Sequence, residues 1–310
     1  MKGLTWMKQT KLFVAGLLAV LISVTGAMAQ EETITEFRIG ILGGENASDR
    51  LRSNECMRAK AEQVLGVPTK IYAPADYNGV IEGLLGGNLD MAWLGASGYA
   101  KVFLTNPDAV EPVLTKINTD GSFGYHAIGF ARVDSGIKSL DDMKGKVFGF
   151  GDPNSTSGYL IPSIEIPQAG YPMKSGEYFK DVKFTGGHEQ TIVAVFNGDI
   201  DGGVTWACGI GNWVDGYNSG ALRKAADAGL VDMTQIQEIW RSKVIPEGPI
   251  VLRKDLPESV KLKITAMLAS LPSMDAECAY GFMAGEIKAI APIDHSDYLS
   301  IIAARKAKSN

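Results

Sequence analysis

Short strands that alternate with helices constrain the fold of this chain more than any other feature. Strand patterns cover residues 37–42, 69–73 and 89–94, and helical patterns cover 47–65 and 76–85 between them. Each strand is followed by a turn of small or polar residues at its carboxyl end. Open parallel sheets bind their ligands at this edge. This order is typical of an α/β domain with a largely parallel sheet.

The same strand–turn–helix plan returns in a second unit, from about residue 126 to 240. Proline-flanked extended segments over 245–253 then suit a crossover between domains, and helical patterns continue to the C-terminus. We therefore predict two lobes, each a mixed sheet with flanking helices, and a ligand cleft between the lobes. The predicted ranges are 30–125 for the first part of lobe 1, 126–244 for lobe 2, and 245–310 for the crossover strand and C-terminal helices of lobe 1.

The most distinctive string is Asp-Pro-Asn-Ser-Thr-Ser-Gly at residues 152–158, which we call the hydroxyl loop. It lies between a turn signal and an apolar run, which is the position of a helix start. Backbone N–H groups there have no partner inside the helix, and Ser155, Thr156 and Ser157 add three side-chain donors. Such a site suits a small anion. The simpler interpretation, that Ser155 only caps a helix, stays open at this point.

Residues 1–29 have the layout of a secretory signal peptide. Three lysines precede an apolar run at 12–24, and a small-residue cleavage site ends at Ala29. We expect cleavage near this site and a soluble periplasmic protein. Removing three lysines from the 30 Lys and Arg leaves 27 against 35 Asp and Glu. This acidic balance argues against nucleic-acid binding, which depends on neutralising phosphates.

Three cysteines follow the predicted cleavage site: Cys56, Cys208 and Cys278. Their spacing matches no metal or redox pattern, and we expect neither a metal nor a cofactor. An odd number leaves at least one free thiol unless two chains pair. Three pairings are possible, and the sequence does not choose among them.

Four strings resemble, in order and spacing, the periplasmic phosphate/phosphite/phosphonate-binding proteins of ABC importers. They are residues 75–83, 151–158, 187–191 and 245–254. The resemblance implies a type II periplasmic binding protein and not an enzyme, with two lobes that close over the ligand by hinge motion. It also implies a monomer that captures 2-aminoethylphosphonate or another small phosphonate and delivers it to a permease in the inner membrane.

The resemblance assigns the phosphonate oxygens to a set of largely neutral donors: Tyr77, Tyr125, Ser155, Thr156, Ser157 and His188. The three hydroxyl residues and the histidine belong to lobe 2. The two tyrosines reach the anion from lobe 1 and from the crossover. Neutral donors at a helix N-terminus bind an anion without a full countercharge.

Two positions depart from relatives that place carboxylates around the ammonium group of 2-aminoethylphosphonate. The corresponding residues here are Cys208 and Gly248, and neither is acidic. We expect Cys208 to be a small residue at the pocket wall, and Trp206 to wall an apolar or very small tail. Glu247, Asp201 and Asp215 are candidate replacements, because an ammonium group without a charge partner is costly to desolvate.

Three alternatives stay open. In the first, the ligand is phosphite or phosphate rather than a phosphonate. In the second, the protein is a sensor whose closed form docks on a membrane receptor. The third is a secreted serine hydrolase in which Ser155, His188 and Asp152 form a triad. The chain has no Gly-x-Ser-x-Gly elbow, which counts against the hydrolase.

Overall fold

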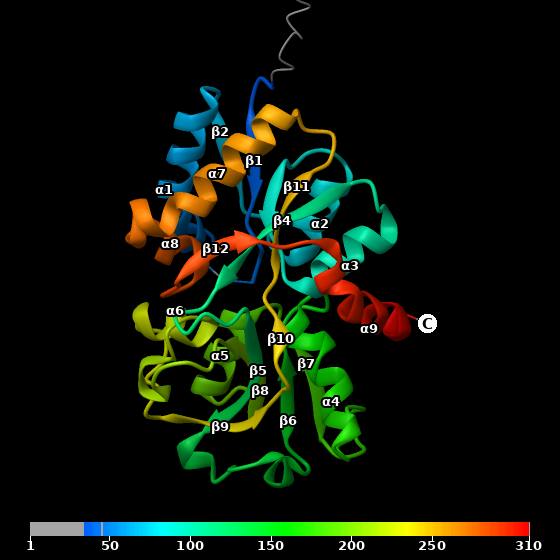
Figure 1. Ribbon diagram of the computed structural model, residues 1–310. Coiled ribbons are helices and arrows are strands. Elements are labelled where there is room, and N and C mark those ends of the chain that lie inside the picture. The colour runs from blue at the N-terminus through cyan, green and yellow to red at the C-terminus, as the bar shows by residue number, and fades with distance from the viewer. Residues whose placement is uncertain (1–33, 45, 310) are drawn as a thin grey trace, which may run out of the picture. The chain divides into compact units, whose positions relative to one another are not determined.

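The computed structural model describes residues 34–44 and 46–309 (Figure 1). The signal peptide predicted for residues 1–29 lies outside the described residues. Over the described ranges, no helix combines the length and the apolar character needed to cross a membrane. Two six-stranded sheets organise the described chain, and each carries helices on both faces.

The first sheet is mixed and has the strand order β12-β4-β11-β3-β1-β2. β1 pairs in parallel with β2 and β3, while β11 pairs antiparallel with β3 and β4, and β12 with β4. Its strands are β1 (Phe37–Gly40), β2 (Thr69–Tyr72), β3 (Met91–Trp93), β4 (Val110–Ile117), β11 (Pro249–Arg253) and β12 (Ala289–Pro292). The helices of this lobe are α1 (Ala47–Leu65), α2 (Tyr77–Leu85), α3 (Ala96–Thr105), α7 (Glu258–Met274), α8 (Ala276–Met283) and α9 (Leu299–Ser309).

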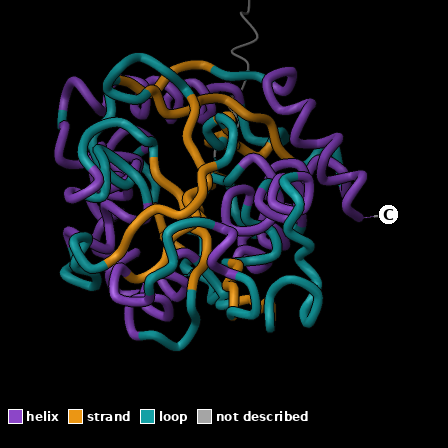
Figure 2. The backbone as a smooth tube through the Cα atoms, turned by 90° about the horizontal axis from the view of Figure 1, so that it is seen from below, coloured by secondary structure: helices purple, strands orange, loops and turns teal. Residues whose placement is uncertain are grey.

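The second sheet is also mixed, because β5 pairs antiparallel with β8, β9 and β10, and β6 pairs in parallel with β7 and β8. Its strands are β5 (Gly124–Arg132), β6 (Val147–Phe150), β7 (Asp181–Phe184), β8 (Gly202–Ala207), β9 (Ile236–Arg241) and β10 (Ile245–Pro246). The helices of this lobe are α4 (Pro162–Gln168), α5 (His188–Asn197) and α6 (Ala221–Asp227). In Figure 2 strands run through the middle of the described chain with helices around them.

Side-chain alternation along the strands builds a separate core on each face of the first sheet. Met91 and Ile250 belong to the core under α1, α7 and α8, whereas their neighbours Ala92 and Val251 belong to the core under α2, α3 and α9. Successive residues of a strand point to opposite faces, so one short strand supplies both cores. This two-sided burial explains why the strand patterns are so apolar.

Local sequence accounts for the ends of the helices that lead toward the site. The Asn46 side chain accepts hydrogen bonds from the Ser48 and Asp49 amides at the start of α1, and Gly66 ends that helix with a φ of 73°. The Asp76 side chain caps α2 by accepting from the Gly79 amide. Both caps begin helices that follow strands β1 and β2, as the sequence predicts.

The chain passes between the sheets twice, from β4 to β5 and from β10 to β11 (Figure 1). These crossings separate the two lobes of a type II periplasmic-binding-protein fold, and the predicted fold class is confirmed. The lobe boundaries given above stay a prediction. The prediction of continuous helix toward the C-terminus is wrong at β12, because Ala289–Pro292 pairs with the distant strand β4. The helix start predicted at the hydroxyl loop is a π-helical turn, Thr156–Leu160, which leads into α4.

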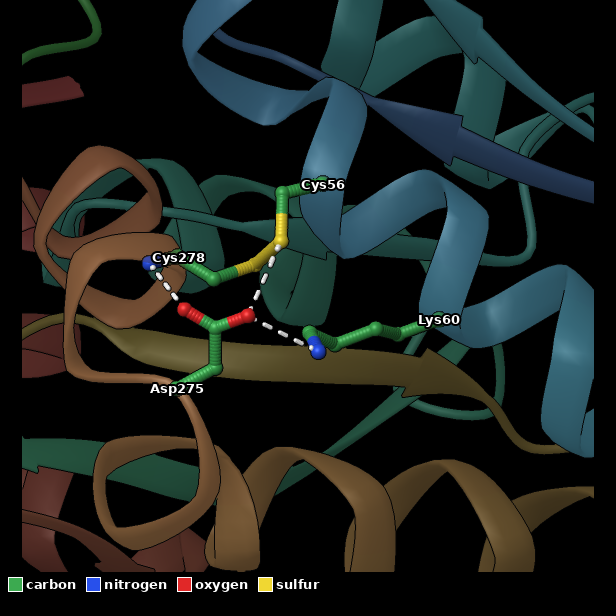
Figure 3. The surroundings of a disulfide bond; sticks show 4 residues. All are labelled: Cys56, Lys60, Asp275 and Cys278. Carbon is green, nitrogen blue, oxygen red and sulfur yellow. Dashed lines mark hydrogen bonds and ion pairs between the residues drawn. A yellow bond between two sulfur atoms is a disulfide. The ribbon is translucent and has the colours of Figure 1, made fainter.

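Only the folded chain decides the cysteine pairing. Cys56 on α1 and Cys278 on α8 form a disulfide with a Cα–Cα distance of 5.7 Å (Figure 3). Asp275 joins the same two helices, since its carboxylate accepts from the Cys278 amide and lies 3.0 Å from the Lys60 ammonium. Two residues 222 positions apart in the sequence are thereby linked within lobe 1.

Candidate functional site

A cavity of about 120 Å³ lies between the lobes, at the carboxyl ends of strands from both sheets. Lobe 1 contributes the turn after β1, the start of α2 and the end of β3. Lobe 2 contributes the hydroxyl loop, the start of α5 and strand β8. Seven of the eight predicted site residues line this cavity: Tyr77, Tyr125, Ser155, Thr156, Ser157, His188 and Glu247.

The hydroxyl loop presents three buried side chains at one wall of the cavity. Ser155 is the N-cap of the π-helical turn, and its hydroxyl oxygen accepts a hydrogen bond from the Gly158 amide. Ser155 therefore does cap the turn, and this cap uses its hydroxyl oxygen as an acceptor and does not use its hydroxyl hydrogen. Thr156 and Ser157 follow at the start of the turn, where backbone N–H groups have no partner inside the helix.

His188 begins α5 directly beside the hydroxyl loop. Its Nε2 lies 3.2 Å from the Ser155 hydroxyl and its Nδ1 lies 3.2 Å from the Thr205 hydroxyl. Burial lowers the pKa of His188 to about 3, and the Lys224 ammonium acts in the same direction. The imidazole is therefore neutral near pH 7, and the donor set at this wall is neutral.

The two tyrosines lie on other elements that face the hydroxyl loop. Tyr77 begins α2, and Tyr125 lies in β5 beside the crossover strand β10, with its ring 5.6 Å from that of Trp206. Burial raises the pKa of Tyr125, and side-chain hydrogen bonding with Ser157 opposes this shift. The phenol stays protonated near neutral pH and can donate into the cavity.

Glu247 is buried at the crossover and is not a free carboxylate. Its Oε1 forms an ion pair of 2.8 Å with the Lys116 ammonium, which is itself fully buried. Burial raises the pKa of Glu247, and the Lys116 charge counteracts this effect. The charge of Glu247 is thus already matched by a group of the protein.

The expectation that Cys208 forms the pocket wall is wrong. Cys208 belongs to the hydrophobic core of lobe 2, where its thiol contacts the Ile210 carbonyl and the Ser219 amide. Gly248 does line the cavity, but a β-carbon there would lie 2.0 Å from the Leu94 carbonyl oxygen. A side chain at position 248 therefore requires a shift of the backbone, and position 208 lies in the core rather than at the cavity wall.

Sequence reasoning missed several charged and aromatic residues of the cavity wall. Trp93, which the sequence analysis does not assign to the site, lines the cavity and donates from Nε1 to the Gly248 carbonyl. Arg50 and Lys224 also line the cavity, although each lies within a helix whose pattern indicates only an amphipathic surface. Lys116 in strand β4 is fully buried, and a buried ammonium group requires a charged or hydrogen-bonding partner.

The lobes touch through the hydroxyl loop itself. The Thr156 hydroxyl accepts from the Ser97 amide of lobe 1 at 2.8 Å, and the Asp152 carboxylate accepts from the Tyr77 amide at 3.3 Å. At the turn before His188, a β-carbon at Gly187 would lie 2.2 Å from the Gly44 Cα of lobe 1. Contacts this close are those of a closed cleft, with the backbones in direct approach.

The hydrolase triad is not assembled. The ring nitrogen of His188 that faces away from Ser155 meets the Thr205 hydroxyl, while Asp152 accepts from the Asn154 and Tyr77 amides. A histidine whose pKa is lowered to about 3 is also a weak general base. Among the described residues, the one cluster with metal-like spacing is Cys56, Asp275 and Cys278, and its two sulfurs are bonded to each other.

Two α/β lobes, a double crossover and a cavity lined with hydroxyls between the lobes define a solute-binding protein of the type II class. The chain belongs to the family described as ABC transporter, phosphonate, periplasmic substrate-binding protein, whose model matches residues 39–298. Members of this family bind a substrate and do not convert it, so the chain is not an enzyme.

Relatives and solved structures agree with this assignment. The chain is 30% identical to the phosphonates-binding periplasmic protein of Escherichia coli, over 80% of this chain and 68% of that protein. It is 29% identical to the phosphate-import protein PhnD of Mycolicibacterium smegmatis, over 88% and 85% of the two chains. PhnD1 from Prochlorococcus marinus, solved in complex with methylphosphonate, shares the fold with a TM-score of 0.72 at 19% identity, over 89% of this chain and 98% of that chain.

Proposed function

We propose that this protein captures a small phosphonate, or a related phosphorus oxyanion, between its lobes in the periplasm and delivers it to an ABC permease in the inner membrane. The observation that carries the proposal is the convergence of the predicted donors. Tyr77, Tyr125, the hydroxyl loop and His188 come from four separate chain segments and bring hydroxyls, phenols and a neutral imidazole to one cavity. The names of the relatives support the ligand class.

The electrostatics of the cavity favour an anion at the hydroxyl loop. Lys224 lies close enough to His188 to lower the pKa of that histidine, and Arg50 also lines the cavity. The direct donors to the anion are neutral, so binding depends on several hydrogen bonds rather than on one strong ion pair. A set of hydrogen bonds of this kind allows release to a transporter.

Titration calorimetry of the purified protein with methylphosphonate, phosphite and phosphate tests the proposal. We expect saturable binding of at least one of the three, and silence with all of them would refute it. Ser157→Ala should raise the Kd about tenfold or more, because a hydrogen bond to a charged group contributes about 1.5–3 kcal/mol. Ser273→Ala, at an exposed position near the end of α7, is the matched control and should bind like the wild type.

The sensor alternative differs in the partner and not in the ligand. Co-purification with a permease complex, in the presence and absence of the bound oxyanion, distinguishes delivery from sensing. We expect the ligand-loaded protein to stimulate ATP hydrolysis by a reconstituted importer. A loaded protein that leaves the importer unaffected and instead activates a membrane receptor would favour the sensor.

A further inference from the structure

A buried lysine lies against residues of the cavity wall. Lys116 lies on β4 and is fully buried, and its ammonium is 2.8 Å from the Glu247 carboxylate and 3.1 Å from the Ser219 hydroxyl. A buried ammonium is costly unless it is paired and hydrogen-bonded. The arrangement meets both conditions with groups from the crossover and from lobe 2.

Two indole rings complete the surroundings of this ammonium. The Lys116 Nζ lies 4.8 Å from the ring centroid of Trp206 and 6.0 Å from that of Trp93. The faces of tryptophan rings attract cations. Trp93, Trp206 and Glu247 all line the cavity. A carboxylate flanked by aromatic faces is the chemistry that recognises an ammonium group, and here the ammonium of the protein already occupies it.

The cavity wall therefore has two parts of different character. Neutral donors of the hydroxyl loop and of His188 face the anionic head group of the proposed ligand. At Trp206 and Glu247, the Lys116 ammonium already pairs with the carboxylate and lies over the indole ring. A ligand with an amino tail would place a second ammonium beside the first, without a carboxylate of its own. Like charges at such short range and low dielectric repel strongly.

We infer that Lys116 determines ligand specificity by excluding phosphonates with an amino tail. The inference rests on the proposed function and narrows it. The ligand is a compact tetrahedral phosphorus oxyanion whose remaining substituent is uncharged, such as methylphosphonate or phosphite. Gly248 is consistent with this, because it lines the cavity and provides no second carboxylate there.

Two ligands of equal size separate charge from length. Ethylphosphonate and aminomethylphosphonate differ by a methyl group in place of an ammonium group, and methylphosphonate and phosphite report on the head group alone. By calorimetry with the wild type, we expect ethylphosphonate to bind at least tenfold more tightly than aminomethylphosphonate. Equal affinity, or tighter binding of the amine, would overturn the inference. If methylphosphonate binds and neither ethylphosphonate nor aminomethylphosphonate does, the cavity excludes ligands by the length of the tail and not by its charge. This result would also overturn the inference.

Two variants test the residue. Lys116→Met releases the Glu247 carboxylate, and we expect the ratio of amine to ethyl affinity to rise at least tenfold. The double variant with Lys116→Met and Glu247→Gln removes the carboxylate as well and should return the preference to the uncharged ligand. A ratio that stays unchanged in Lys116→Met, with a thermal transition showing a folded protein, contradicts the role of Lys116. If Lys116→Met does not fold, the comparison of ethylphosphonate with aminomethylphosphonate on the wild type still tests the exclusion of amino tails. If the wild type shows no detectable binding of any oxyanion, the proposed function itself is refuted.

Discussion

Arg305→Met should weaken ligand binding although Arg305 lies outside the cavity. Arg305 belongs to the C-terminal helix α9 of lobe 1, and its guanidinium donates to the Ser97 hydroxyl at 2.6 Å and to the Asn154 side-chain oxygen at 2.8 Å. Asn154 lies in the hydroxyl loop of lobe 2. The second hydrogen bond therefore joins the lobes, and we expect it to stabilise the closed state, which is the state that binds ligand tightly.

The size of the effect follows from the geometry. A hydrogen bond that involves a charged group contributes about 1.5–3 kcal/mol. Arg305 is half-buried, and in the open state its guanidinium regains water, so we take about 1–2 kcal/mol as the loss from the closed state. Since about 1.4 kcal/mol corresponds to a tenfold change, the Kd for the oxyanion should rise roughly 5- to 30-fold.

The assay is calorimetry of the ligand that binds the wild type most tightly. Lys306→Met is the matched control, because Lys306 is the next residue on α9 and is exposed. We expect the control to keep the wild-type Kd, and both variants to keep the thermal midpoint of the ligand-free protein within a few degrees. A Kd for Arg305→Met within twofold of the wild type would show that this hydrogen bond does not bias the lobes toward closure.

Two further predictions concern closure and pH. Gly187→Ala should raise the Kd at least tenfold without lowering the thermal midpoint of the ligand-free protein, because the added methyl group would lie 2.2 Å from the Gly44 Cα of the other lobe; an unchanged Kd would mean that the lobes bind ligand without this approach. Burial lowers the pKa of His188 to about 3, below its value in the unfolded chain. The contribution of the neutral His188 to the free energy of unfolding is therefore fully present above pH 6.5. It is lost as the pH falls from 6.5 toward 3, by up to about 1.4 kcal/mol per pH unit. Chemical unfolding at several pH values should show a shallower acid slope for His188→Asn than for the wild type, and parallel slopes would refute the assignment.

The sequence alone was sufficient for the class of fold and for most of the cavity. Strand and helix patterns are local, because a buried strand or a capped helix is encoded in a window of about ten residues. The hydroxyl loop, Tyr77 and His188 each follow a strand, and the rule that ligands bind at the carboxyl ends of strands brings them to one edge. Seven of the eight residues that the sequence and its family resemblance assign to the site line one cavity.

The tertiary structure alone decided which distant groups meet. The disulfide between Cys56 and Cys278, the strand β12 paired with β4, and the core position of Cys208 all depend on contacts across long stretches of chain. The same holds for the ammonium of Lys116 beside Glu247. A short stretch of sequence does not predict this ion pair. The cost of burying each charge is offset only when the crossover segment brings Glu247 next to Lys116. Local patterns thus predict where an oxyanion head group binds, whereas the choice among its tails depends on a contact made only in the folded protein.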